Sequence, residues 1–178
     1  MSQVALQAID QEIAPSIDLQ VFKEAMADFP AAVTIITTWD DDGHPIGATL
    51  SAVSSLSASP PMMLACFDRK SKTLEHLHSG KPFLIHVLGE GQEQLAMLFA
   101  GKQADKFAGI DWSQGPLGLP ELSGAACTLA CEVADLLPGG DHLIVTGNIR
   151  HIGHHDDHSP LLYHRRKMYP VPCTGASV

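Results

Sequence analysis

The chain has 178 residues and a mass of 19.0 kDa, with 45% hydrophobic and 17% charged residues, which suits one domain with a sizeable core. Its formal net charge is −9, and the 11 Lys and Arg residues form no long basic patch, which argues against a nucleic-acid-binding protein. No apolar run approaches the roughly 18 to 20 residues that span a bilayer. Residues 1–17 contain no Lys or Arg and no continuous apolar segment, so we expect no secretory signal and a cytoplasmic protein.

Residues 1–17 are expected to form a loosely ordered extension that packs on a neighbouring subunit. After it, Asp18 stands where the N-cap of a helix is expected, and Pro30 stands where a helix must end. Between them, apolar residues recur at intervals of three and four, namely Leu19, Phe22, Met26 and Phe29. This spacing predicts one amphipathic helix.

The rest of the chain is dominated by strand patterns. Residues 32–39 are rich in Val, Ile and Thr, and the turn at 40–43 leads into a second predicted strand. The predicted strands are 32–39, 45–56, 62–67, 83–88, 125–137, 142–152 and 161–163, and the predicted short helices are 71–78 and 92–100. Residues 102–120 are expected to be mainly loop, and 138–141 to be a hairpin turn. Tight turns between consecutive strands predict a mainly β fold, an antiparallel barrel of six or seven strands with peripheral short helices.

The stretch from Gly47 to Pro61 consists largely of small hydroxyl-bearing and β-branched residues. Such residues favour extended backbone but offer little bulk for a core, so a flat ligand with polar edges can lie against them. An apolar strand follows, and then cations and hydroxyls stand at 68–73, before the predicted helix. The N–H groups of a helix start attract phosphate, so the two stretches together indicate a nucleotide-like cofactor.

The same residues carry a resemblance to a known family. The order G-x-T-x-S-x-x-S-S-x-S-x-x-P-P over 47–61, with Cys66 and the Asp68-Arg69 pair after it, resembles the short-chain flavin reductases of the FMN-binding split-barrel superfamily. The similarity covers residues 18–170 as one domain and leaves 171–178 as a tail. It implies a split barrel, a homodimer with flavin near the subunit interface, and NAD(P)H-dependent reduction of FMN or FAD. Such enzymes usually pass reduced flavin to a partner monooxygenase.

The resemblance also implies site residues. The expected flavin contacts are Thr49, Leu50, Ser51, Ala52, Cys66, Phe67, Asp68, Arg69, Ser71, Thr73, Phe99, Ala100, Gly101 and Lys106. Residues 49–52 occupy the family's T-A-N-S segment, and Leu50 and Ala52 depart from its commonest residues, so only backbone contacts are expected there. Arg69, Ser71 and Thr73 form the expected phosphate set. His142 and Tyr169 are expected on the nicotinamide side. No protein acid or base is required for hydride transfer, because the cofactors carry that chemistry.

Two alternatives from other classes remain open. One is a flavin-binding module without catalysis. The other is a metal-binding or interaction protein built on the His-rich segment 151–158, because imidazoles and carboxylates bind zinc or nickel. Cys127 and Cys131 lie four residues apart in a strand pattern, so we expect buried thiols on one face, with a structural zinc site as the alternative. The local signatures of hydrolases and Rossmann proteins are missing from the sequence.

Overall fold

The computed structural model describes residues 17–155 and 157–171, so the predicted extension and tail, apart from Ile17 and Val171, lie outside the described residues. The helical elements are α1 (Leu19–Ala27), α2 (Lys72–Glu75), the 3₁₀ turn η1 (Pro116–Gly118) and α3 (Glu93–Ala100). The strands are β1 (Ala31–Ala32), β2 (Thr34–Trp39), β3 (Pro45–Leu50), β4 (Val53–Ala58), β5 (Pro61–Asp68), β6 (Pro82–Val87), β7 (Trp112–Gln114), β8 (Pro120–Leu122), β9 (Cys127–Gly139), β10 (His142–His154), β11 (Leu161–His164) and β12 (Lys167–Pro170).

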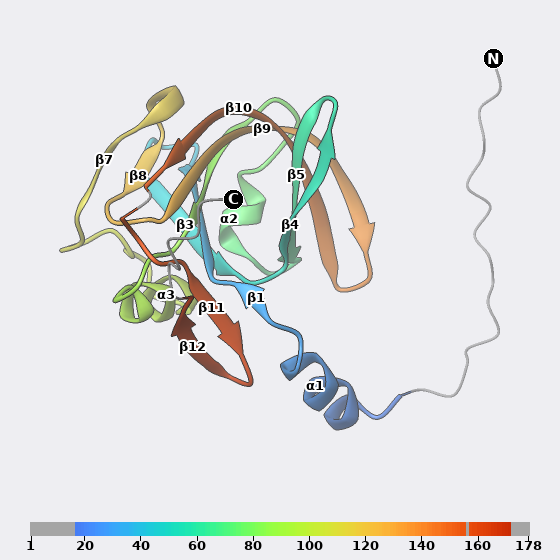
Figure 1. The fold of residues 1–178 in the computed structure, drawn as a ribbon. Helices are drawn as coiled ribbons and strands as arrows, with labels where there is room; N and C mark the ends of the chain where they lie inside the picture. Colours follow the sequence, from blue (N-terminus) through green and yellow to red (C-terminus); the bar gives the residue numbers. More distant parts are fainter. Residues whose placement is uncertain (1–16, 156, 172–178) are drawn as a thin grey trace, which may run out of the picture.

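Seven of these strands form one antiparallel sheet in the order β3-β2-β6-β9-β10-β5-β4. Its two outer strands, β3 and β4, are consecutive in the chain, and the Cys66 N–H donates to the Ala52 carbonyl across their junction, 2.9 Å. Figure 1 shows the sheet curving around its own interior. The predicted mainly β fold with antiparallel strands and few short helices is confirmed.

The interior of the curved sheet is apolar because alternate residues of each strand point into it. Phe67, Phe83 and Val145, from β5, β6 and β10, belong to this core and are almost fully buried. Leu74 and Leu77 join the same core from α2 and the residues after it, and in Figure 1 α2 lies inside the curve of the sheet. The short helix therefore fills the interior that the strands leave.

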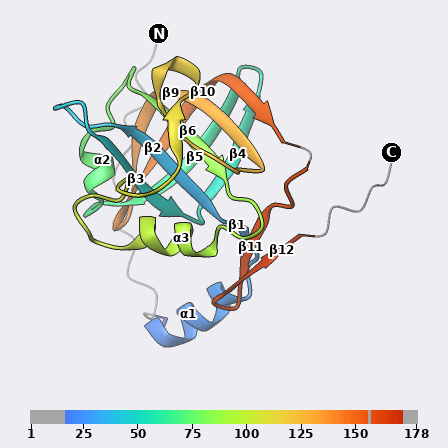
Figure 2. The same ribbon diagram turned by 90° about the vertical axis from the view of Figure 1, so that its left-hand side faces the viewer.

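A second apolar layer lies on the outer face of β2. Ile35 points to it, whereas its neighbour Ile36 points into the barrel core. Ala96 and Phe99 of α3 complete this layer, and Figure 2 shows α3 lying along β2 and β3. Two smaller sheets, β1-β11-β12 and β7-β8, flank the barrel.

The N-cap prediction at Asp18 is confirmed, because its carboxylate accepts from the N–H groups of Gln20, 2.8 Å, and Val21, 3.1 Å. The helix after it ends at Ala27, before Pro30. The prediction that Cys127 and Cys131 share a face is also confirmed, since both pack in the barrel core as free thiols. Burial raises the pKa of the Cys131 thiol to about 12, which keeps it protonated and unreactive.

Three predicted elements differ in the structure. The strand predicted over 45–56 is two strands, β3 and β4, because the chain bends at Ser51 and Ala52. The helix predicted over 71–78 ends at Glu75, and the Ser71 hydroxyl makes no capping bond. The predicted loop over 102–120 contains β7 and η1, where the Trp112 ring packs edge-on against Trp39 at 5.9 Å and holds the segment to the barrel.

Candidate functional site

The junction between β3 and β4 is exposed. The Leu50 side chain points into the barrel core, whereas Ser51 and Ala52 are exposed. The Thr49 hydroxyl donates to the Ala96 carbonyl of α3 at 2.6 Å, so it fixes the strand to the helix. Of the four residues predicted to line a flavin ring, Ser51 and Ala52 thus offer backbone at the surface, and Leu50 offers no side chain to a ligand there.

The end of β5 lies beside this junction through the bond from Cys66 to Ala52. Cys66 is half-buried and Phe67 is buried in the barrel core, while Asp68 and Arg69 are exposed. Phe67 can therefore meet a ligand only through its main chain. Asp68 shapes the turn that follows, because its carboxylate accepts from the Lys70 N–H at 2.8 Å.

The structure joins Arg69 to the turn that precedes His142. The Arg69 N–H donates to the Asp141 carbonyl, 3.1 Å, and its Nε donates to the Gly140 carbonyl, 3.0 Å. His142 also pairs with Asp68 across β5 and β10. The predicted phosphate residue and the predicted nicotinamide residue, 73 positions apart in the sequence, are therefore held in one surface patch.

His142 is anchored through one ring nitrogen. Its Nδ1 lies 2.7 Å from the Asp141 carboxylate, and because a carboxylate accepts, Nδ1 carries the proton and Nε2 is the nitrogen that can act on a ligand. The hydrogen bond and the charge of His142 lower the pKa of Asp141, with a smaller contribution from the charge of Arg69. The His142 side chain is 42% exposed, so a second substrate can reach it.

Lys106 ties the end of α3 to β3. Its Nζ donates to the Phe99 carbonyl, 2.6 Å, and to the Gly47 carbonyl, 3.1 Å. Partial burial, with the positive charge of Lys72 as a second cause, lowers the pKa of Lys106. The Phe99 ring packs so closely on Gly47 that a Cβ there would stand 2.8 Å from the ring, which explains the glycine. Lys106 thus places a positive charge behind the strand that leads into the β3–β4 junction.

The other predicted site residues are less accessible or lie on other elements. Ser71 is half-buried and Thr73 is buried, whereas Ala100 is exposed and Gly101 half-buried at the end of α3. Tyr169 lies on β12, opposite Leu162, in the small sheet with β1 and β11. It therefore belongs to a different sheet from the one that carries His142.

Sequence reasoning missed His86, which is fully buried on the outer face of β6. Its Nδ1 donates to the Ile35 carbonyl and its Nε2 accepts from the Leu122 N–H, both at 3.1 Å. Burial lowers the pKa of this imidazole to about 4, so it is neutral at pH 7. The residue links β2, β6 and β8 and has a structural role. Strand alternation at 82–87 could have placed His86 on the face opposite Ile85. It could not have identified the hydrogen-bond partners of the imidazole.

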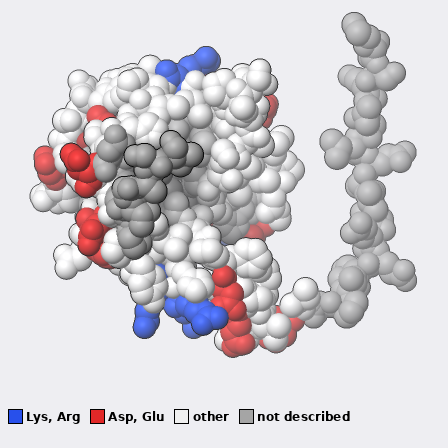
Figure 3. All heavy atoms as spheres, viewed as in Figure 1, with Lys and Arg blue, Asp and Glu red and all other residues white. Residues whose placement is uncertain are grey.

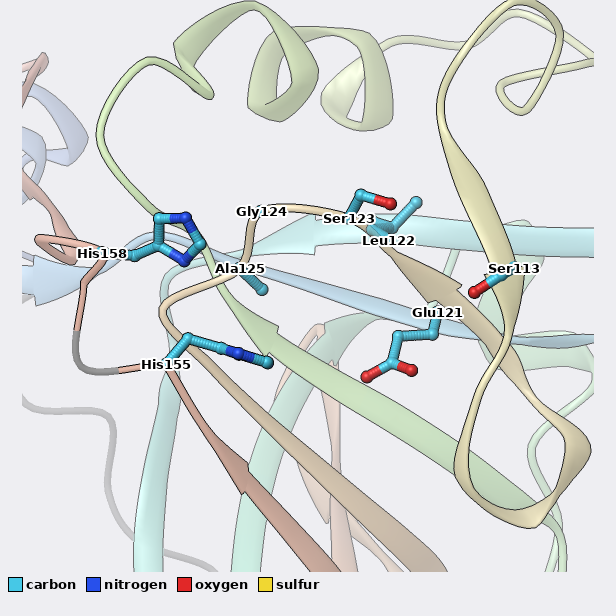
Figure 4. Close-up of a pocket in the computed structure, with 8 residues that line it drawn as sticks. All are labelled: Ser113, Glu121, Leu122, Ser123, Gly124, Ala125, His155 and His158. Atoms are coloured by element: carbon cyan, nitrogen blue, oxygen red, sulfur yellow. The ribbon is translucent and has the colours of Figure 1, made fainter.

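Two surface hollows lie apart from these residues. One, of about 280 Å³, is bounded by Glu121 and by His155 and His158 of the His-rich segment. Figure 4 shows the His155 side chain extending toward Glu121.

Among the described residues, the ligating atoms of Asp40, Asp42 and His44 lie within 4.8 Å of one another, and the His-rich segment forms no such group. Asp40 instead holds the β2–β3 turn, accepting from the N–H groups of Asp42 and His44.

A curved antiparallel sheet with few short helices is the fold that solved flavin reductases share with this chain. The chain belongs to the flavin reductase like domain family, whose model matches residues 26–172. In the described part of the chain, none of the helices has the length and apolar character needed to cross a membrane.

Relatives agree with this family. The chain is 35% identical over 152 residues to the flavin-dependent monooxygenase reductase subunit HsaB of Rhodococcus jostii, covering 85% of this chain and 77% of that protein. It is 37% identical over 159 residues to a flavin reductase (NADH) of Kitasatospora aureofaciens, covering 87% and 83%. Two relatives from Rhizobium meliloti are longer, and the chain spans 57% and 42% of them.

A solved structure has the same fold. The NADH:FAD oxidoreductase SgcE6 of Streptomyces globisporus, in complex with NAD and FAD fragments, superposes with a TM-score of 0.82 at 29% identity. The match covers 92% of this chain and all of that chain.

Proposed function

We propose that this flavin reductase transfers hydride from NADH or NADPH to FMN or FAD at the patch formed by the β3–β4 junction, Arg69 and His142. The observation that carries the proposal is the pair of bonds from Arg69 to the Gly140–Asp141 turn. They hold a phosphate-binding cation directly beside the histidine that we assign to the second substrate. The names of two relatives, a flavin reductase (NADH) and an NADH:FAD oxidoreductase, favour NADH as the donor.

The residues of this patch fit a flavin. The exposed main chain at Ser51 and Ala52 allows close approach to the polar edge of a ring, because neither residue has a bulky side chain. Arg69 uses Nε for the turn, so its terminal nitrogens remain for a phosphate. Lys106 adds positive charge behind the strand, which favours the negative charge of a reduced ring.

The bound flavin supplies the hydride acceptor, and the protein positions the two substrates. His142 has its Nδ1 held by Asp141, so its ring is fixed with Nε2 available to a nicotinamide carboxamide. Asp141 is ionised at neutral pH and accepts from Nδ1, and because the hydrogen bond from His142 lowers the pKa of this carboxyl, the pair persists into more acidic solution. Arg69, with the half-buried Ser71 near it, binds the flavin phosphate, whereas the predicted phosphate role of Thr73 does not fit its burial.

We further propose that the enzyme is a homodimer and that a flavin-dependent monooxygenase uses the reduced flavin it releases. The reductase subunit of a flavin-dependent monooxygenase from Rhodococcus jostii is 35% identical to this chain, which supports the monooxygenase. The site is open on the single chain, which suits a subunit interface that closes over it.

Anaerobic stopped-flow reduction tests the proposed activity. Protein mixed with FMN or FAD and then with NADH or NADPH is expected to bleach the oxidised-flavin absorbance faster than protein-free flavin. Flavin binding without such bleaching would show a non-catalytic flavin module instead. Absence of flavin binding, with binding of Zn²⁺ or Ni²⁺, would favour the interpretation based on the His-rich segment.

Replacing His142 with Ala is expected to raise the KM for the nicotinamide substrate, or to slow flavin reduction, by roughly tenfold, the worth of about one hydrogen bond. Flavin affinity is expected to stay unchanged, because the lost contact lies on the nicotinamide side. His151→Ala, an exposed histidine of the same strand, is the matched control and should change neither property. A loss of flavin affinity with a normal reduction rate would instead assign His142 to the flavin.

A further inference from the structure

The hollow bounded by Glu121, His155 and His158 is separate from the proposed flavin site. Strand β10 begins at His142 and ends at His154, so the flavin site and this hollow lie at opposite ends of the strand. A strand of 13 residues is up to about 40 Å long. Flavin reduction therefore gives this hollow, of about 280 Å³, no function.

The ionisable side chains around the hollow have no partners in the protein. Among the described residues, the Glu121 carboxylate and the imidazoles of His155 and His158 take part in no hydrogen bond and no ion pair. The other hollow, of about 310 Å³, differs in this respect, because its Asp28 and Arg165 pair with each other at 2.6 Å. A carboxylate and two imidazoles that line one hollow and have no other partner are available to a ligand.

The charge around the hollow favours a cation as the ligand. With the histidines neutral, Glu121 carries the only formal charge among the residues that line it. The segments 107–149 and 151–164, which contain every lining residue, have no Lys or Arg. In the view of Figure 3, the described surface over β7 and β8 shows acidic side chains and no basic ones. A positively charged ligand therefore meets no repulsion from neighbouring cations here.

The two imidazoles stand at a separation that suits one shared metal ion. Imidazole and carboxylate groups are ligands of divalent transition-metal ions such as Zn²⁺. The ring centres of His155 and His158 are 6.0 Å apart, and the rings are tilted by 55°. Two imidazoles that bind one zinc ion through nitrogens at about 2.1 Å have their ring centres about 5 to 6 Å apart. The observed separation is therefore close to the one that a shared ion requires.

The Glu121 carboxylate can complete such a site from β8. Figure 4 shows the His155 side chain extending toward Glu121. The ligating atoms of Glu121, His155 and His158 do not all lie within 4.8 Å of one another. Both histidines are exposed and Glu121 is half-buried, so these side chains can change rotamer and approach a common ion.

A buried hydroxyl without a partner lies near His155. Thr128 is 1% exposed, and its Oγ1 has no hydrogen-bond partner among the described residues. Of its two cross-strand neighbours, His86 uses both ring nitrogens for other bonds, and Gly153 has no side chain. A Cβ at Gly153 would lie 3.9 Å from both His155 Nε2 and Thr128 Cβ, so a small group fits between them. A water molecule on a metal ion at His155 would give this hydroxyl the partner it lacks.

We propose that Glu121, His155 and His158 bind a divalent transition-metal ion, and that Thr128 holds a water molecule on this ion. The ion joins the segment after β10, which carries the two histidines, to β8, which carries Glu121. Because the three ligands come together only in the folded chain, the ion stabilises the domain by mass action. The inference goes beyond the proposed flavin chemistry and does not depend on it, because the two sites share no residue.

Isothermal titration calorimetry of metal-free protein without a histidine tag measures the binding of Zn²⁺. The wild type is expected to bind one Zn²⁺ ion per chain and to gain in Tm when it does. His155→Ala and Glu121→Gln are expected to lose at least the roughly 10- to 100-fold in affinity that loss of an outer partner of a metal site costs. Thr128→Val should also weaken Zn²⁺ binding, yet leave the Tm of the metal-free protein unchanged or higher, because it removes an unpaired buried hydroxyl.

Two histidine variants serve as controls. His151→Ala removes an exposed histidine of β10 that does not line the hollow, and His44→Ala removes the histidine of the group with Asp40 and Asp42. Both are expected to bind Zn²⁺ as the wild type does. Binding lost in His44→Ala and kept in His155→Ala would place the ion at the β2–β3 turn and overturn the proposed site, as would a wild type that binds no Zn²⁺. Flavin reduction is expected to be equal with and without Zn²⁺, and its absence in both would count against the proposed function alone.

Discussion

Lowering the pH from 7 to 4 is expected to reduce the free energy of unfolding by roughly 3 kcal/mol through His86 alone. The folded-state pKa of this imidazole is about 4 because of burial, against 6.5 for the free side chain. Its ring is enclosed between β2 and β8, with Nδ1 on the Ile35 carbonyl and Nε2 on the Leu122 N–H. Protonation of Nε2 would turn this hydrogen-bond acceptor into a donor, which would then face the N–H of Leu122, also a donor.

The direction of the effect follows from the two pKa values. Between pH 6.5 and about 4 the unfolded chain binds a proton at residue 86 and the folded chain does not. Stability therefore rises with pH across this window, and is lost as the pH falls through it. Above pH 7 His86 is neutral in both states and contributes no pH dependence. A loss of roughly 3 kcal/mol is a large share of the 5 to 15 kcal/mol that stabilise a typical domain.

Urea unfolding at several pH values, with His86→Gln beside the wild type, isolates this residue from the carboxyl groups that titrate in the same range. Gln can donate to Ile35 and accept from Leu122 but does not titrate. The stability difference between wild type and variant should thus change by roughly 3 kcal/mol in favour of the variant from pH 7 to pH 4. His78→Gln, at an exposed histidine, should run parallel to the wild type. Parallel curves for all three proteins would show that His86 does not control the acid response.

Local signals in the sequence were sufficient for much of the fold. Asp18 caps α1 with its own carboxylate, an interaction that spans only three residues. The 138–141 turn places Gly140 at a φ of +71°, a conformation that glycine adopts without strain. Tight turns between consecutive predicted strands then indicated an antiparallel barrel. These features depend on neighbouring residues, so a single sequence carries them.

Features set by long-range contacts could not be predicted in the same way. Ser51 and Ala52 are as compatible with a strand as the residues around them, and the bend there accompanies the bond from Cys66 that joins β5 to the junction. The hairpin between β11 and β12 turns at Arg165 and Arg166, with φ values of 49° and 63°, without the Gly or Asn that normally signals such a turn. The turn that separates β11 from β12 was therefore not predicted.

In the candidate site, too, features set by neighbouring residues were predictable and features set by long-range contacts were not. The sequence suggested Arg69 and His142 separately, for two different substrates. Their proximity depends on the register that pairs Asp68 with His142, which only the folded sheet sets. Strand alternation, by contrast, could have shown that Leu50 and Phe67 point inward, because each lies one residue from an outward-facing neighbour.

Removing the Arg69 side chain is expected to weaken flavin binding by about 1.5 to 3 kcal/mol, a 10- to 150-fold increase in the dissociation constant. Arg69 is exposed and contributes nothing to the barrel core, so folding should be little changed. Its Nε bond to the Gly140 carbonyl fixes the guanidinium, and a fixed group loses less entropy when it binds a phosphate. Titration of flavin-free Arg69→Ala with FMN and FAD measures the effect.

Lys70→Ala is the matched control, because it removes the same charge one residue along an equally exposed turn. A directed hydrogen bond predicts a large loss for Arg69→Ala and less than threefold for Lys70→Ala, whereas a general positive potential predicts similar, salt-sensitive losses for both. Repeating the titrations at low and high ionic strength separates the directed hydrogen bond from the general positive potential. Equal losses for the two variants would remove Arg69 from the phosphate set. An unchanged affinity in Arg69→Ala, with slower reduction by NADH, would instead mean that Arg69 acts by holding the turn that carries His142.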